Sequence, residues 1–201
     1  MRKHGISFLF LALLTVIGLM SCNKKKITNR EEWVASINKP ENGVNKTERV
    51  GAIKAALSFR PWQLMMPKGY KGENKTQNGD PYKLKDKLFF VLSLSANNKE
   101  LLRQLPFAQY SEMVQVLAFR MNDYVQAYPD DREPVQPLEC IFQQTYGMGV
   151  ANNLVIVFNK KKLLDADKIK IKIKEFGLNT GDLDFDLKTD DIKQIDNVSL
   201  N

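Results

Sequence analysis

The sequence predicts a mainly β protein: an antiparallel β-sandwich of about seven strands, immunoglobulin-like or transthyretin-like in outline, with one or two short helices. From about residue 50 onward, apolar and polar residues alternate with a period of two, as they do in half-buried strands. Glycine, proline and asparagine mark turns between most of these segments. The clearest alternation lies near the C-terminus, in residues 168–174 and 182–188.

The first residues have the features of a targeting segment. Arg2 and Lys3 give a short positive start, and an apolar run of 15 residues extends from Ile6 to Met20. A helix that spans the hydrocarbon core of a membrane needs about 20 apolar residues, so this run is too short for a stable span. We therefore expect a signal peptide over residues 1–21.

The apolar run ends in Leu19-Met20-Ser21-Cys22, which resembles the lipobox of bacterial lipoproteins. The resemblance implies transfer of diacylglycerol to the Cys22 thiol, cleavage before Cys22 and acylation of the new N-terminus. Two or three acyl chains on one residue anchor a protein essentially irreversibly. In Gram-negative lipoproteins, Asn23 in place of Asp implies onward transport to the outer membrane. The lack of acidic residues after the cysteine favours the periplasmic face, with surface exposure as the alternative.

Residues 22–48 are expected to form the lipidated cysteine and a tether. Within this stretch, Thr28-Asn29-Arg30-Glu31 has the spacing of a capping box, and Trp33 and Ile37 follow it. We therefore expect a short helix over residues 31–37, which the Asn- and Gly-containing stretch 38–43 ends. As a free coil, residues 23–48 would span about 28 Å.

The sandwich domain is expected over residues 49–201. Strands are predicted over residues 56–60, 88–95, 135–144, 153–158, 168–174 and 182–188. A short helix is predicted over residues 98–105, ended by Pro106. Residues 107–121 fit either a strand or a helix, because Phe107, Tyr110, Val114 and Leu117 also have helical spacing.

The last two strands are expected to pair in an antiparallel arrangement about the turn-rich loop 177–181. The isoleucines of residues 168–174 would then share one face with Leu183, Phe185 and Leu187. The other face would set lysines against aspartates, and each cross-strand pair contributes about 0.2–1 kcal/mol. These charges also oppose edge-to-edge association.

Composition excludes several classes of function. Once residues 1–21 are removed, 180 residues remain, and loss of Arg2 and Lys3 lowers the formal net charge from +7 to +5. The interspersed acids do not make the basic patch of a nucleic-acid binder. The only histidine, His4, lies in the signal. The mature chain therefore has no Ser-His-Asp or Cys-His site and no imidazole zinc ligand, and we expect no enzyme activity, no cofactor and no metal.

Cysteine usage agrees with this interpretation. The chain has two cysteines, so lipidation of Cys22 leaves Cys140 without a disulfide partner. Because Cys140 alternates with Leu138 and Phe142, we expect all three side chains on one face of a strand, with Cys140 a buried, inert thiol.

The candidate partner-binding residues lie in and before a lysine-rich segment, residues 67–87. They are of types enriched in interface cores: Arg60, Trp62, Met65, Met66, Tyr70 and Tyr82. The alternative is that Trp62, Leu64 and Met66 cap the core of the sandwich.

Two further stretches are weaker candidates. In Tyr146-Gly147-Met148-Gly149, the glycines permit a turn and could also allow close approach of a ligand. The aspartates 182, 184 and 186 lie along one strand about 6.8 Å apart, which does not converge their oxygens on a calcium ion. We expect them to form a solvated charged face.

The sequence therefore predicts a membrane-anchored envelope lipoprotein whose sandwich is a non-catalytic docking module for an envelope protein partner. The alternative is a lipoprotein that binds a glycan or cell-wall fragment. An exposed apolar patch would favour docking, whereas a pocket lined with aromatic side chains and convergent polar groups would favour ligand capture.

Overall fold

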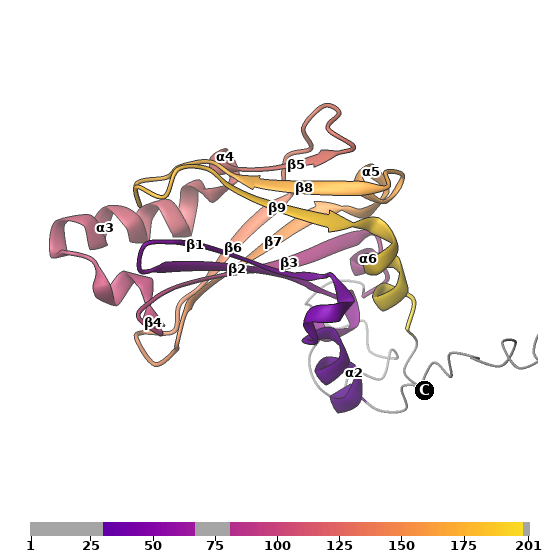
Figure 1. Cartoon of the computed structure of the whole chain (residues 1–201), viewed down its shortest axis with the longest axis horizontal. Coiled ribbons are helices and arrows are strands. Elements are labelled where there is room, and N and C mark those ends of the chain that lie inside the picture. The colour runs from indigo at the N-terminus through magenta and orange to yellow at the C-terminus, as the bar shows by residue number, and fades with distance from the viewer. Residues whose placement is uncertain (1–29, 67–80, 199–201) are drawn as a thin grey trace, which may run out of the picture.

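The structure, a computed structural model, describes residues 30–66 and 81–198, without the side chains of Pro81 and Tyr82. It confirms the antiparallel β-sandwich. A six-stranded sheet has the order β1-β2-β3-β7-β6, with β4 beside β3, and a three-stranded sheet has the order β5-β8-β9 (Figure 1). The strands are β1 (Asn45–Val50), β2 (Ile53–Arg60), β3 (Lys87–Ala96), β4 (Lys99–Glu100), β5 (Val125–Pro129), β6 (Glu139–Gln143), β7 (Asn152–Asn159), β8 (Lys168–Ile173) and β9 (Leu183–Lys188).

Three of these strands were not predicted: β1 and β4 lack an apolar alternation, and β5 alternates over only five residues. β1 is polar along most of its length, β4 has two residues, and β5 directly follows a helix. β1 pairs with β2 across a tight turn. Pairing with a neighbour therefore defines these strands, because their own sequences give only weak signals.

β3 lies at the centre of the larger sheet, between β2 and β7. Its register sets Phe90 opposite Phe59 of β2 and Ile156 of β7. Phe59, Phe90 and Phe158 are fully buried, and their ring centroids lie 5.7 and 6.1 Å apart in tilted and edge-on contacts. Such contacts add about 0.5–1.5 kcal/mol per pair beyond simple burial.

The predicted pairing of the last two alternating segments is confirmed. Ile171 lies opposite Phe185 on the core face, and Lys170 lies opposite Asp186 on the outer face. All three isoleucines of β8 are completely buried. The period of two thus turns an apolar face inward and a charged face outward.

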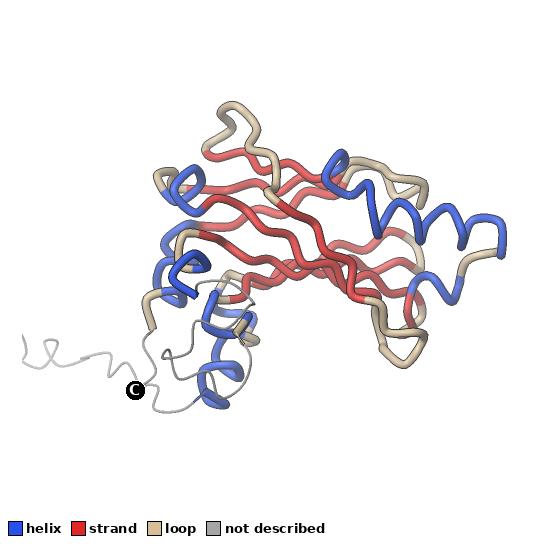
Figure 2. The backbone as a smooth tube through the Cα atoms, turned by 180° about the vertical axis from the view of Figure 1, so that it is seen from behind, coloured by secondary structure: helices blue, strands red, loops and turns tan. Residues whose placement is uncertain are grey.

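The helices gather at the two ends of the sandwich. They are α2 (Arg30–Ile37), α3 (Phe107–Gln115), α4 (Met121–Tyr124), α5 (Lys160–Leu164) and α6 (Thr189–Asp196), with a π-helical turn, η5 (Val116–Arg120), between α3 and α4. Short 3-10 turns are η1 (Pro40–Asn42), η2 (Trp62–Met65), η3 (Pro81–Leu84) and η4 (Leu101–Gln104). α2 and α6 lie at one end and α3 lies at the other (Figure 1), and Figure 2 shows the same arrangement from behind.

No helix in residues 30–66 and 81–198 has the length and apolar character to cross a bilayer.

The short helix expected in the tether is present, but it belongs to the folded unit. Trp33 and Ile37 of α2 are 1% and 0% exposed and pack in the main core, as does Val44. Their burial removes large apolar surfaces from water, which outweighs the entropy of a free tether. Residues 30–48 therefore pack with the folded unit, and residues 22–29 lie outside the described part.

The ambiguous stretch 107–121 is helical. α3 buries Met113, and η5 buries Val116 and Leu117 against the sandwich. The helical spacing therefore reflects a helix whose apolar face is buried only in its second half, because Phe107 and Tyr110 are exposed.

The expected face of β6 is only partly formed. Cys140 and Phe142 pack against the core, but Leu138 precedes the strand and is 49% exposed. The Leu138 N–H donates to the Val157 carbonyl at 2.7 Å, so the chain enters β6 just after this residue. Burial raises the pKa of the Cys140 thiol to about 12, as expected for an inert cysteine.

Candidate functional site

The best-formed hollow in the described part of the chain is a groove at the α3 end of the sandwich. Its cavity has a volume of about 430 Å³, within the range of small-ligand and side-chain sites. One wall comes from η4 and α3, and the other comes from the end of β6 and the loop that leads to β7. The lining residues are Glu100, Leu102, Arg103, Tyr110, Val114, Phe142, Gln144, Thr145, Tyr146, Gly147 and Asn152.

A buried carboxylate organises the base of this groove. Glu100 is 3% exposed, and its Oε1 accepts hydrogen bonds from the Thr145 hydroxyl at 2.5 Å and from the Gly149 N–H at 2.7 Å. Its Oε2 accepts from the Asn152 side-chain amide at 3.4 Å, and the Asn152 carbonyl oxygen in turn accepts from the Leu102 N–H. A buried charge is tolerated when several donors satisfy it. Glu100 therefore ties the loop after β6 to the start of η4.

The loop that Glu100 holds contains a tight turn. Tyr146 and Gly147 have φ angles of +50° and +80°, and the Met148 N–H donates to the Thr145 carbonyl at 3.0 Å. Two central residues with positive φ are typical of a type I′ turn. The Arg103 guanidinium donates to the Gly147 carbonyl at 2.8 Å, which fixes the turn to η4.

Gly149 is required for a different reason from Gly147. A Cβ atom at position 149 would lie 2.8 Å from Glu100 Oε1 and 3.2 Å from the Ala151 carbonyl oxygen. The absence of a side chain thus lets the Gly149 backbone approach the carboxylate closely.

Large apolar side chains face solvent on α3 and on the loop after β6, and two of them, Tyr110 and Tyr146, line the groove. Phe107 and Tyr110 lie one turn apart on α3 and are 86% and 42% exposed. On the loop side, Tyr146, Met148 and Val150 are 85%, 86% and 77% exposed. We call these five residues the apolar rim. Exposed apolar groups that gather beside a groove, rather than singly, mark interaction surfaces.

Holding this rim in place requires unfavourable conformations. A non-glycine residue in the left-handed region costs on the order of 1–2 kcal/mol, and Tyr146 adopts it while exposing its ring. The neighbouring η5 is a π-helical turn, a feature that occurs frequently at functional sites. Strain and exposure in one region make the groove the candidate functional site.

The residues proposed from sequence as a partner patch lie elsewhere. Trp62 and Met65 of η2 are half-buried and cover Phe89, Val155 and Val157, which form a second small core on the outer face of the larger sheet. The Lys85 ammonium lies 5.3 Å from the centre of the Trp62 ring.

Of the remaining members of that patch, the structure describes the side chains of Arg60 and Met66. Arg60 and Met66 are half-buried, and burial lowers the pKa of the Arg60 guanidinium from its usual value. Tyr70 lies outside the described residues, and so does the side chain of Tyr82 in η3. Cys22 also lies outside the described part. Of the residues in the capping alternative, Leu64 packs against the main core and Trp62 against the outer-face core, whereas Met66 is half-buried outside both.

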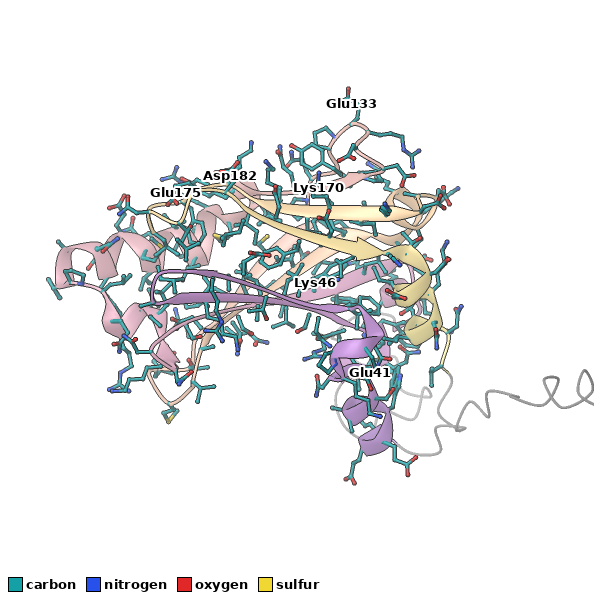
Figure 3. All side chains as sticks on the ribbon, in the orientation of Figure 1. Glu41, Lys46, Glu133, Lys170, Glu175 and Asp182 are labelled. Atoms are coloured by element: carbon teal, nitrogen blue, oxygen red, sulfur yellow. The ribbon has the colours of Figure 1, made fainter. Side chains whose placement is uncertain are left out.

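The charged face of β8 and β9 is the solvated surface that the sequence indicated. Lys172 Nζ lies 3.4 Å from Asp182 and 3.7 Å from Asp184. The charge of Asp184 and then the hydrogen bond to Asp182 raise the pKa of Lys172. Figure 3 shows Lys170 and Asp182 on the outer side of this layer.

Among residues 30–66 and 81–198, no group of three His, Cys, Asp or Glu side chains is placed to hold a metal ion.

Sequence reasoning identified the 146–149 turn but missed Glu100 and the role of α3. The glycine-containing turn with two large apolar residues was a usable signal for the rim. Glu100 carries no local signal, because its partners are 45 to 52 residues away in sequence.

Comparison of the chain with protein-family models, curated proteins and solved structures finds no match.

Proposed function

We propose that this protein is a lipid-anchored lipoprotein of the outer membrane, facing the periplasm, whose β-sandwich is a non-catalytic docking module. The observation that carries the proposal is the apolar rim. Three of its side chains, Tyr146, Met148 and Val150, lie on the loop that the Glu100 network holds, and the other two, Phe107 and Tyr110, are exposed on α3. A surface of this kind is stabilised when a partner covers it.

The position of the rim relative to the anchor supports docking. The anchor at Cys22 is eight residues ahead of Arg30, which begins α2, so these residues reach at most about 28 Å. α2 lies at the end of the sandwich opposite α3 (Figure 1). A protein tethered near α2 can therefore present the rim away from its point of attachment.

The side chains that are present support a non-catalytic role. The mature chain has no histidine. Glu100 is the single acid among the described residues that line the groove, and its two oxygens already accept hydrogen bonds. A glycosidase mechanism needs two carboxyl groups that flank the substrate.

Site-specific crosslinking in intact cells tests this function. A photoreactive residue in place of Tyr146 or Met148 is expected to capture one envelope protein in stoichiometric yield. The same residue in place of Lys168, an exposed position on the charged face of β8, is expected not to. Equal capture from all three positions, or no capture from any, would contradict docking at the rim.

A second function, capture of a glycan or cell-wall fragment, is favoured by one specific observation. The groove combines the rings of Tyr110, Phe142 and Tyr146 with the polar groups of Arg103 and Asn152, and sites with this mixture hold small ligands. Titration calorimetry with a disaccharide muropeptide tests it. Saturable binding that Tyr110→Ala abolishes would favour this function over docking.

The anchor has its own test. In cells that carry Cys22→Ser, lipid labelling is expected to vanish and uncleaved precursor to accumulate. Persistent labelling of the variant would contradict the assignment of Cys22.

A further inference from the structure

The edge strands of the two sheets differ in how they are protected. β1 carries Lys46, Glu48 and Arg49 and lies beside β9, whose outward side chains include Asp184 and Asp186. Charges of this kind on an edge strand prevent pairing with other chains. These two edges are therefore unsuitable for an added strand.

β5 is protected by the chain that follows it. The N–H and carbonyl groups of Ala127 bond with those of Val135 at 3.0 and 2.7 Å, in an isolated bridge on the free side of β5. This bridge occupies hydrogen-bonding groups that a partner strand would need.

β6 is the exception. Its sequence, Glu-Cys-Ile-Phe-Gln, has one charged residue and no lysine or proline, and Ile141 is 49% exposed. Within the described residues, β6 pairs with β7 alone, and no hydrogen bond from any other element reaches residues 139–143. Every second N–H and carbonyl of this edge is therefore available to another strand.

The groove is lined in part by the end of this same strand. Phe142 of β6 and Gln144, just after it, line the groove together with Tyr110 and Val114 of α3, and η5 and α4 lie close to β6. Alternate side chains of a strand added to β6 would point towards the groove, because successive residues of a strand face opposite sides. An open edge with an adjoining pocket is the arrangement used in recognition by strand addition.

The charges that face the groove define the occupant. Glu100 is satisfied by its donors, and Arg103 is the single basic residue in the lining. Two residues of the apolar rim, Tyr110 and Tyr146, line the groove, and all five are exposed. The complement of such a surface is an extended segment with few charges and with apolar residues at every second position.

We infer that the partner docks by adding an extended segment of its own chain to the free edge of β6, with alternate apolar side chains in the groove. The inference rests on the proposed docking function and names the chemistry of its partner. Main-chain hydrogen bonds to β6 would hold the segment, and the groove and apolar rim would select its side chains.

Selection from a phage-displayed library of random twelve-residue peptides against the mature lipoprotein tests this inference. Selected peptides are expected to lack proline and to alternate apolar residues with others. N-methylation of one peptide residue at a time removes one N–H donor. Loss of a paired donor weakens binding by about tenfold, so the losses are expected at every second position. A helix or a side-chain-only contact would not give this period of two.

Matched protein variants locate the site. Tyr110→Lys places a charge on the groove wall and is expected to weaken binding of the selected peptide at least tenfold. Phe119→Lys changes an aromatic residue that is 84% exposed on η5 and does not line the groove. This control is expected to bind within twofold of the unaltered protein, and circular dichroism checks that both variants are folded.

The other outcomes separate this inference from the docking function. N-methylation losses without a period of two would overturn strand addition. Dimerisation that Tyr110→Lys abolishes, with no peptide selected, would show that a second copy of this chain is the occupant and would also overturn it. If no peptide is selected but the rim still crosslinks to one envelope protein, docking stands and strand addition fails. If neither experiment gives a partner, both proposals fail.

Discussion

Replacement of Glu100 by alanine tests whether one buried carboxylate holds the candidate site together. The change removes the acceptor of two short hydrogen bonds, from Thr145 and Gly149, and of a longer one from Asn152. Hydrogen bonds to a charged group contribute about 1.5–3 kcal/mol each, so the two short bonds represent roughly 3–6 kcal/mol.

Two effects offset part of this loss. The carboxylate no longer has to be kept out of water, which relieves a desolvation cost of several kcal/mol for a buried ion. Thr145 and Gly149 are only partly buried, so water can reach the freed donors. We therefore expect Glu100→Ala to lower the free energy of unfolding by about 2–3 kcal/mol, and Glu100→Gln, which keeps one acceptor oxygen, by about 1 kcal/mol.

Urea denaturation of the mature chain, followed by tryptophan fluorescence, measures these changes, because Trp33 is buried in the core. Glu133→Ala is the matched control, since Glu133 lies exposed on the 130–138 loop (Figure 3) and is expected to change stability by less than about 0.5 kcal/mol. If Glu100→Ala is as mild as this control, the assignment of Glu100 as the organiser of the loop is refuted.

A double-mutant cycle with Gly149→Ala sharpens the same test. The added Cβ would lie 2.8 Å from Glu100 Oε1, so Gly149→Ala alone is expected to cost about 1–3 kcal/mol. Removal of the Glu100 carboxylate relieves that contact, and the double variant should therefore lose less than the sum of the single changes. Strict additivity would mean that the two residues do not act on each other.

Three further predictions concern other parts of the protein. Burial raises the pKa of Glu175, but hydrogen bonds from the N–H groups of residues 177–179 and from the Thr180 hydroxyl outweigh it, and the net pKa is lowered from 4.5. The stabilisation is present above pH 4.5 and is lost as the pH falls through the folded-state pKa, so urea titrations should show Glu175→Gln to be destabilising at pH 6 and progressively less so at lower pH; an effect that does not change with pH would contradict this. Trp62→Ala is expected to lower the free energy of unfolding by about 1.5–3 kcal/mol because the Trp62 ring covers the outer-face core. If the variant instead keeps its stability but loses crosslinking to the envelope protein, the result would support the partner patch around Trp62. Because the pKa of Cys140 is about 12 in place of 9.0, this thiol should react with iodoacetamide at pH 8 about a thousandfold more slowly than an unfolded cysteine. The Cys22→Ser protein isolates this reaction, and rapid labelling of it in the native state would disprove the burial of Cys140.

The sequence by itself determined the features that depend on neighbouring residues. The alternation in β8 and β9 predicted their pairing and the burial of Ile171 and Phe185, because a period of two has one apolar face in any antiparallel sheet. Other local patterns, the capping-box spacing and the glycines, predicted the helix at Trp33 and the turn at Gly147. The positive start, the apolar run and the lipobox-like residues give the signal segment and Cys22 as an expectation.

Only the tertiary structure decided which surfaces are covered. Trp62 and Phe107 are both large aromatic residues beside proline, yet Trp62 is half-buried over Phe89 and Val157 whereas Phe107 is 86% exposed. Likewise, Glu100 has no distinctive sequence context, and its role depends on loop residues that pairing of β7 with β3 brings beside it. Exposure and hydrogen bonding depend on contacts between residues distant in the chain, and a local pattern does not contain them.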